Sequence, residues 1–281
     1  MTDGTTTGLP APPTRSGGLL WTTGVLLTAS FALHFFQGQT SVQVFWIGFT
    51  VLMTLFCLCS GALLVGWPST LAFLGIGCAF GLFFEALSIK IGFPFGYYEY
   101  TPVSAPVFGP GVLGVPYIIP LGWYVIVYLS YMIVNLMIEQ RPLANAGVGL
   151  SIWLSLTGAA VVTAYDLALD PFMIHKVGAW KMAAEGSYFG EEAKGFLGWM
   201  LVAFTISLLF RLTHHRLKSH ATRAVSTLAA VYPLAGYAGW CLIFVVAGDP
   251  PATRSIAAVA MGVPILTALA GLVKWWKATP A

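Results

Sequence analysis

The stretch Gly92-Phe93-Pro94-Phe95-Gly96-Tyr97-Tyr98-Glu99-Tyr100 interrupts a series of apolar runs in this chain. It is too rich in glycine, proline and tyrosine for a membrane span, and too apolar for a solvated loop. The apolar run before it carries Phe83-Phe84-Glu85, so a carboxylate stands just ahead of the aromatic break. Glycine and proline fix a non-helical backbone, which at membrane depth is tolerated only where protein or a cavity covers it. The stretch therefore predicts a re-entrant, pocket-lining loop.

The rest of the chain has the composition of a membrane protein. It is 58% hydrophobic and 8% charged, whereas an ordinary globular protein carries about 25% charged residues. Apolar runs of about eighteen residues or more recur, and each can cross a hydrocarbon core about 30 Å thick. The formal charge of +3 is small and spread over many loops, which argues against a nucleic-acid partner.

We expect an all-α integral membrane protein of about eight transmembrane helices, with the glycine- and tyrosine-rich loop between the third and the fourth. The apolar runs cover about 19–37, 42–65, 69–89, 115–138, 146–168, 196–211, 224–246 and 255–273. Residues 1–18 read as a disordered tail, 19–275 as a single polytopic membrane domain and 276–281 as a short C-terminal tail. Two connections are long, about 90–114 and about 169–195.

Loop charges predict a multi-pass protein of the cell membrane with both termini in the cytoplasm. The basic segment Arg211–Arg223 should face the cytoplasm, because Lys and Arg concentrate in cytoplasmic loops. Counting spans outward from it places eight of the thirteen Lys and Arg residues inside and five outside. Both long connections then fall on the external side.

Three carboxylates at the external ends of the spans are the candidate catalytic residues: Glu85, Asp166 and Asp170. Ionisable groups inside a span are costly and are functional candidates by default. A spacing of four places Asp166 and Asp170 on one helix face, and Pro171 is expected to end or bend that helix. Like charges held close cannot all ionise, so one carboxyl group becomes available as a general acid.

Two other interpretations of these carboxylates exist. In the first, Asp166 and Asp170 cap loop amides and Glu85 pairs with Lys90. In the second, Asp166-x-x-x-Asp170 is a magnesium–diphosphate motif of a membrane prenyltransferase, but such enzymes clamp the metal with two aspartate-rich motifs and the sequence contains one. We expect neither a metal nor another cofactor.

Aromatic residues around the loop are the candidate substrate-binding residues. Those of the loop and of the following apolar run are Phe93, Phe95, Tyr97, Tyr98, Glu99, Tyr100 and Trp123, with Glu99 included by position. Tyr117 and Tyr124 are expected in the aromatic belt that marks a membrane interface.

At these residues the chain resembles the integral-membrane carotenoid hydratases, which include carotenoid 1,2- or 1′,2′-hydratases and enzymes of the bacterioruberin pathway. The matching segments lie over roughly residues 80–200 and are Gly92–Thr101, Gly114–Trp123, Thr163–Met173, Tyr188–Gly190 and Phe196–Trp199. These motifs add Tyr165 and Tyr188 to the substrate-binding candidates. Where relatives have a short apolar link before Phe196, this chain has Glu191-Glu192-Ala193-Lys194-Gly195, a departure that indicates a different carotenoid.

The resemblance implies that water is added across the terminal C1–C2 double bond of an acyclic carotenoid, such as a lycopene- or bisanhydrobacterioruberin-like end. Asp166 or Asp170 would be the acid, and the other aspartate or Glu85 would position the water. The implied partners are the carotenoid in the bilayer, water, membrane lipid and other enzymes of the carotenoid pathway. Two different functions remain open: a carotenoid prenyltransferase or elongase, and a non-catalytic carotenoid- or lipid-binding or transport protein.

Overall fold

The computed structural model describes residues 15–36, 42–102, 108, 110–143, 146–184, 186–217 and 225–279. Eight helical segments of this part of the chain are long and apolar enough to cross a membrane. The predicted all-α membrane fold is therefore confirmed. Residues 1–14 of the predicted tail lie outside the described residues, and the first helix begins at Arg15, ahead of the predicted start near 19.

The helices and strands follow the predicted order. The first four spans are α1 (Arg15–Ala32) with the short turn η1 (Leu33–Phe36), α2 (Val42–Leu64), α3 (Trp67–Ile91), and α5 (Ile118–Val134) with the π-helical turn η2 (Asn135–Glu139). The last four are α6 (Val148–Phe172) with the π-helical turn η3 (Met173–Val177), α7 (Ala193–Leu217), α8 (Thr227–Ala247), and the successive helices α9 (Ala252–Ala260) and α10 (Gly262–Ala278). The strands are β1 (Tyr98–Tyr100), β2 (Gly111–Val112), β3 (Val115–Pro116) and β4 (Trp180–Met182).

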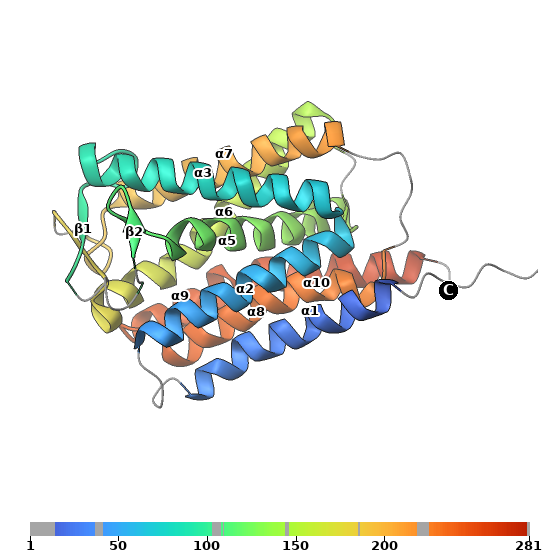
Figure 1. Ribbon diagram of the computed structural model, residues 1–281, viewed down its shortest axis with the longest axis horizontal. Coiled ribbons are helices and arrows are strands. Elements are labelled where there is room, and N and C mark those ends of the chain that lie inside the picture. Colours follow the sequence, from blue (N-terminus) through green and yellow to red (C-terminus); the bar gives the residue numbers. More distant parts are fainter. Residues whose placement is uncertain are drawn as a thin grey trace, which may run out of the picture.

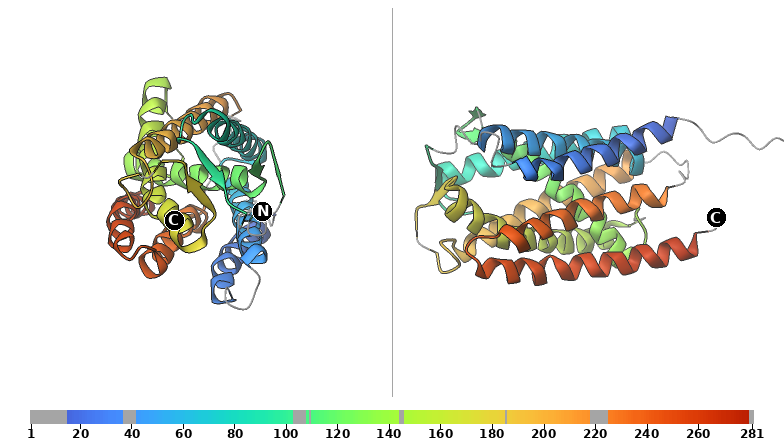
Figure 2. Two further views of the ribbon diagram at one scale, coloured as in Figure 1. Left: turned by 90° about the vertical axis from the view of Figure 1, so that its left-hand side faces the viewer. Right: turned by 90° about the horizontal axis from the view of Figure 1, so that it is seen from below.

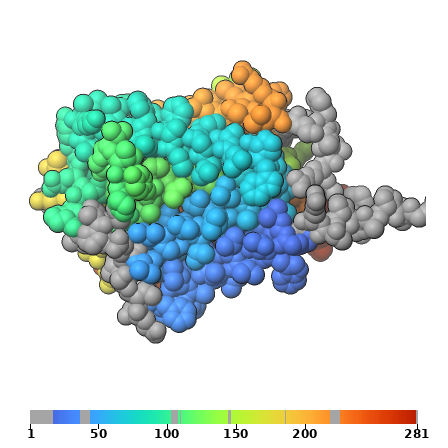
Figure 3. Space-filling view, in the orientation of Figure 1, coloured from blue at the N-terminus to red at the C-terminus, as the bar shows by residue number. Residues whose placement is uncertain are grey.

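The outer surface carries large apolar side chains, as contact with lipid requires. Trp21 is 78% exposed, Leu197 68% and Leu242 63%. The side chains of α2 and α3 form one continuous face, and the segment around β2 and β3 lies against the end of α3 (Figure 3). In a water-soluble protein so large an apolar surface would cause association.

Helix α5 is the centre of the bundle, and the other helices are arranged around it in the end-on view (Figure 2). Glycines of α3 allow it to approach α5 closely, as is common between membrane helices. A Cβ atom on Gly77 would lie 2.9 Å from Tyr124 Cα, and one on Gly81 would lie 2.8 Å from Trp123 Cδ1. Tyr124 is completely buried here, so its expected place in the interfacial belt is wrong, whereas Tyr117 is 54% exposed.

The two long connections meet at one end of the bundle. β1 pairs with β4 in antiparallel register, with Glu99 opposite Lys181, and β2 and β3 form a small hairpin. These strands lie at the end opposite the start of α1 and the end of α10 (Figures 1 and 2). The candidate loop and the aspartate-bearing end of α6 are thereby brought to the same end of the molecule.

Candidate active site

A cavity of about 140 Å³ lies at the end of the bundle that carries the strands. One water needs about 10–15 Å³ of such space, so the cavity can hold part of an organic molecule. Its wall is mostly apolar, nearly half of the lining residues are aromatic, and its ionisable carboxyl groups are those of Glu85, Asp170 and Glu191. Among the described residues that line it, none is Lys, Arg or His.

Glu85, on the last turns of α3, is buried and is surrounded by hydrogen-bond donors. The Trp123 indole donates to one carboxylate oxygen at 2.8 Å. The hydroxyl groups of Tyr98 and Tyr100 donate to the other, Tyr100 at 3.3 Å. The pKa of each tyrosine is raised well above its usual value, mainly by burial and next by the charge of Glu85. Both hydroxyl groups therefore stay protonated and act as donors. Burial of Glu85 opposes its ionisation, and the three donated hydrogen bonds act against this by stabilising the ionised carboxylate. The exposed Lys90 takes no part in the contacts of Glu85 that the structure describes.

The glycine- and proline-containing loop has a defined structure because its backbone groups find partners. Gly92 ends α3 in the left-handed conformation, with φ of 71°. The Ser88 hydroxyl accepts from the Phe95 N–H at 2.9 Å and donates to the Gly96 carbonyl at 3.2 Å. This turns Phe95 inward, where it stacks on Trp123 with ring centroids 5.9 Å apart. A Cβ atom on Gly198 would lie 2.6 Å from Phe95 Cδ1, so α7 also makes room for the loop.

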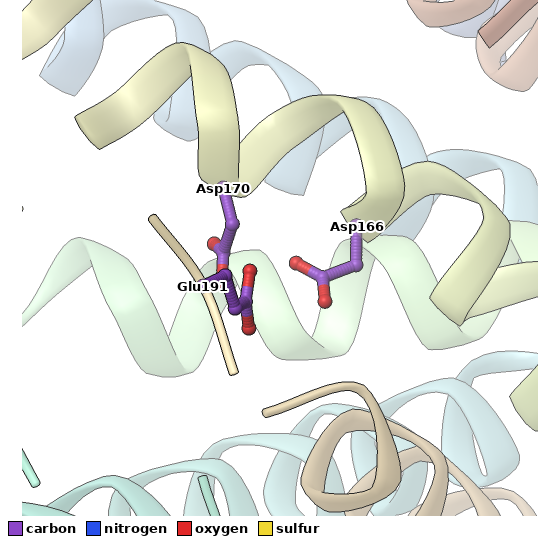
Figure 4. Close-up of side chains that lie close together, drawn as sticks. All are labelled: Asp166, Asp170 and Glu191. Carbon is purple, nitrogen blue, oxygen red and sulfur yellow. The ribbon is translucent and has the colours of Figure 1, made fainter. Parts of the chain in front are cut away.

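Asp166, Asp170 and Glu191 form a cluster of three buried carboxyl groups, which Figure 4 shows pointing toward one another. One oxygen from each lies within 4.8 Å of the others, a spacing at which carboxyl groups can share protons or bind a cation. Asp170 lies within hydrogen-bonding reach of Asp166, Glu191 and the Trp199 indole. Ionised carboxylates only accept hydrogen bonds, so bonds within the cluster require that it carries protons. Both oxygens of Asp166 lack an N–H or O–H donor among the described residues.

Pro171 explains how the cluster is assembled. Helix α6 does not end at this proline but continues to Phe172 and into η3. Proline has no N–H, so the carbonyl four residues earlier, that of Leu167, loses its helical partner. The Tyr188 hydroxyl donates to this carbonyl at 2.8 Å. The hydrogen bond anchors the turn that follows Tyr188 to α6, beside Asp166 and Asp170.

Tyr188→Phe should therefore weaken the site without touching a carboxyl group. The variant leaves the Leu167 carbonyl buried without a partner, which costs about 1–3 kcal/mol. We expect a lower melting temperature in detergent together with lower activity. Tyr97→Phe is the matched control, because Tyr97 is 55% exposed and should melt like the wild type. Equal melting temperatures for the wild type and Tyr188→Phe would contradict the anchoring role.

Glu191 is the site residue that the sequence interpretation missed. Tyr188 and Glu191 exchange backbone hydrogen bonds of 3.1 and 2.9 Å across a two-residue turn. Its central residues Phe189 and Gly190 have φ of 47° and 90°, as a type I′ turn requires. A side chain on Gly195 would overlap the Glu191 carboxylate, so this glycine leaves the space for it. In the sequence, the one indication of this residue was the acidic stretch 191–195, where the chain departs from its relatives.

Two tryptophans connect the carboxyl groups of the cavity. The indole rings of Trp123 and Trp199 lie with centroids 4.3 Å apart. Trp123 donates to Glu85, and the Trp199 indole is within hydrogen-bonding reach of Asp170. The two indoles therefore link Glu85 to Asp170 through their N–H edges, and aromatic rings in a cavity wall can stabilise a cation through cation–π attraction.

The structure brings some predicted site residues together and places others elsewhere. Those lining the cavity are Glu85, Asp170, Phe95, Tyr98, Tyr100, Trp123 and Tyr165. Asp166 does not line the cavity, but its carboxyl group lies next to that of Asp170, which does. Phe93, Tyr97 and Glu99 are exposed and do not line the cavity, and Tyr188 contacts α6 as described above.

A family model described as carotenoid biosynthesis protein matches residues 41–267. The chain belongs to this family. No curated protein and no solved structure matches the chain significantly.

Membership of the carotenoid biosynthesis family confirms the membrane carotenoid family expected from the motifs. It supports an enzymatic role in carotenoid biosynthesis and leaves the individual reaction to be inferred from the site. The matched range includes the cavity, all three carboxyl groups of the cluster and the two tryptophans between them.

Proposed function

We propose that the protein is a carotenoid hydratase that adds water across the terminal C1–C2 double bond of an acyclic carotenoid end. The observation that carries the proposal is the contrast between two sets of carboxyl groups in one aromatic cavity. Glu85 accepts hydrogen bonds from Tyr98, Tyr100 and Trp123, whereas the cluster around Asp170 must carry protons. Two carboxyl groups in contrasting environments are the usual basis for one acid and one base in a site.

The reaction needs three steps at this site. A carboxylic acid of the cluster transfers its proton to C2, and the electrons of the double bond form the new C–H bond. The tertiary cation at C1 is then captured by water, which forms the C–O bond and releases a proton to Glu85. That proton returns to the cluster, so the balance is one water added and no change in oxidation state.

The walls of the cavity suit such an intermediate. Trp123 and Trp199 line the cavity and link Glu85 to Asp170, so aromatic rings stand beside the carboxyl groups that transfer the protons. Cation–π attraction in a desolvated site contributes about 2 kcal/mol or more. The absence of Lys, Arg and His from the described lining also avoids repulsion of the cation.

The position of the cavity fits a long apolar substrate. A carotenoid is about as long as a bilayer is thick, about 30 Å, so its end group reaches a cavity at one end of a membrane bundle. With both termini in the cytoplasm, as the loop charges predict, this end is the external one.

Expression of the chain in a host that accumulates lycopene tests the proposal. We expect a carotenoid whose mass has increased by one water, detected by mass spectrometry of the extracted pigments. An Asp170→Asn chain present at equal amount in the membrane is the control. If no acyclic carotenoid offered gains water, the proposal is wrong.

A prenyl-transferring enzyme is the second candidate, because three oxygens within 4.8 Å could hold a magnesium ion. Such an enzyme would also have to neutralise a diphosphate, and the described lining residues include no cationic side chain. Activity that requires an added prenyl diphosphate and stops with a chelator would favour this candidate. Water addition that is unchanged by the chelator would favour the hydratase.

A further inference from the structure

We propose that Glu191 is the catalytic acid, the residue that delivers the proton to the substrate. The inference rests on the proposed hydratase function and assigns the acid within it. It differs from the sequence-based choice of Asp166 or Asp170, and it gives a catalytic role to the stretch where the chain departs from its relatives.

Access to the cavity distinguishes the three carboxyl groups. Asp170 and Glu191 line the cavity, whereas Asp166 does not. Asp170 is surrounded by Asp166, Glu191 and the Trp199 indole, so its oxygens are engaged as acceptors. Glu191 is 1% exposed, and its Oε2 meets no hydrogen-bond partner among the described residues. Of the three, Glu191 is therefore the carboxyl group that lines the cavity and also has an oxygen with no described hydrogen-bond partner.

The protonation state of Glu191 suits an acid. Burial, and next the charge of Asp170, raises the pKa of Glu191 to about 11. The ionisable groups that interact with it are Asp166 and Asp170 on α6 and Tyr188 on its own turn. Each of these three groups is either neutral or negatively charged. None of them therefore favours the loss of the Glu191 proton. At neutral pH Glu191 is therefore protonated and carries the proton that the reaction needs.

The turn holds Glu191 in this position from both sides. The Tyr188 hydroxyl fastens the turn to the Leu167 carbonyl, and Gly195 leaves room for the Glu191 side chain. In the reaction the O–H bond of Glu191 breaks as the C2–H bond forms, and the carboxylate that remains faces the cation at C1. The proton that Glu85 takes from water returns to Glu191 at the end of the cycle.

Glu191→Gln tests the assignment sharply, because glutamine imitates the protonated acid. It keeps the size of the side chain and a donor for Asp170, but it has no acidic proton. We expect water addition to slow by at least about a hundredfold, the contribution of a positioned acid, while the protein still retains carotenoid. Glu191→Asp, which keeps the acid on a shorter side chain, should retain more activity than Glu191→Gln. Glu192→Gln, on the neighbouring residue outside the cavity lining, should act like the wild type.

Rates are to be expressed per molecule of carotenoid bound to purified protein, so a variant that accumulates poorly still gives a result. The assignment is wrong if Glu191→Gln hydrates within a few-fold of the wild-type rate while Asp170→Asn is inactive. In that case Glu191 only supports Asp170. A wild-type chain that never adds water would instead overturn the proposed function itself, so the two failures are distinguishable.

Discussion

Replacing Asp170 by asparagine should reduce the rate of water addition by at least about a hundredfold, the range of a positioned acid–base group. Asp170 is the carboxyl group that contacts every other member of the cluster and also lines the cavity. Asparagine presents N–H donors where Asp166 and Glu191 need an acceptor, and it removes a negative charge beside the cation. The measurement is the initial rate of hydration in membranes, with protein quantified by immunoblot.

Asp166→Asn is the informative comparison. Asp166 lies next to Asp170 but not on the cavity wall, and asparagine can still donate a hydrogen bond to Asp170. We therefore expect a smaller loss than for Asp170→Asn, with the carotenoid still bound. Full activity in Asp170→Asn would show that hydration does not need the Asp170 carboxylate, and a larger loss in Asp166→Asn would reverse the order of the two aspartates.

Glu85→Gln should have the second large effect, a loss of about a hundredfold or more in the rate of hydration. The substitution removes the charge that faces the cation and the base that takes the proton of water. It also leaves the Tyr98, Tyr100 and Trp123 donors with a weaker acceptor. Because the loss concerns the reaction and not the apolar wall, the amount of bound carotenoid should change little.

Glu99→Gln is the matched control for Glu85→Gln. Glu99 belongs to the same loop region but is exposed and pairs across the strands with Lys181. We expect wild-type hydration from it. Equal losses in the two variants would show that the loop responds to any change of charge, and would remove the special role assigned to Glu85.

The order of the spans followed from sequence because it depends on local composition. Each apolar run of sufficient length forms a helix in lipid, where every backbone group must bond within its own segment. The convergence of Glu85 and Asp170 was predicted for a related reason, since the topology places both long connections at one end. The same reasoning could not predict that Tyr117 is exposed and Tyr124 buried. Tyr124 is buried because α3 approaches it closely at Gly77, a contact between distant segments.

Glu191 could not be predicted because its position depends on contacts between distant segments. In sequence it lies in an acidic stretch that reads as a solvated surface. The turn that carries it is fastened by the hydrogen bond from Tyr188 to Leu167, and that bond uses the carbonyl left free by Pro171. The exposure of Phe93 and Tyr97 has a similar origin, since only the inward turn at Phe95 decides which aromatic residues of the loop reach the cavity.

The cavity lies at the end of the bundle opposite the start of α1 and the end of α10. When one end of a bilayer-length carotenoid occupies it, the other end is near the opposite membrane surface. Hydrating both ends of a symmetric carotenoid at this cavity then requires that the molecule dissociate, turn round and bind again. We therefore expect distributive kinetics: the singly hydrated carotenoid accumulates before the doubly hydrated one, and excess substrate increases its share.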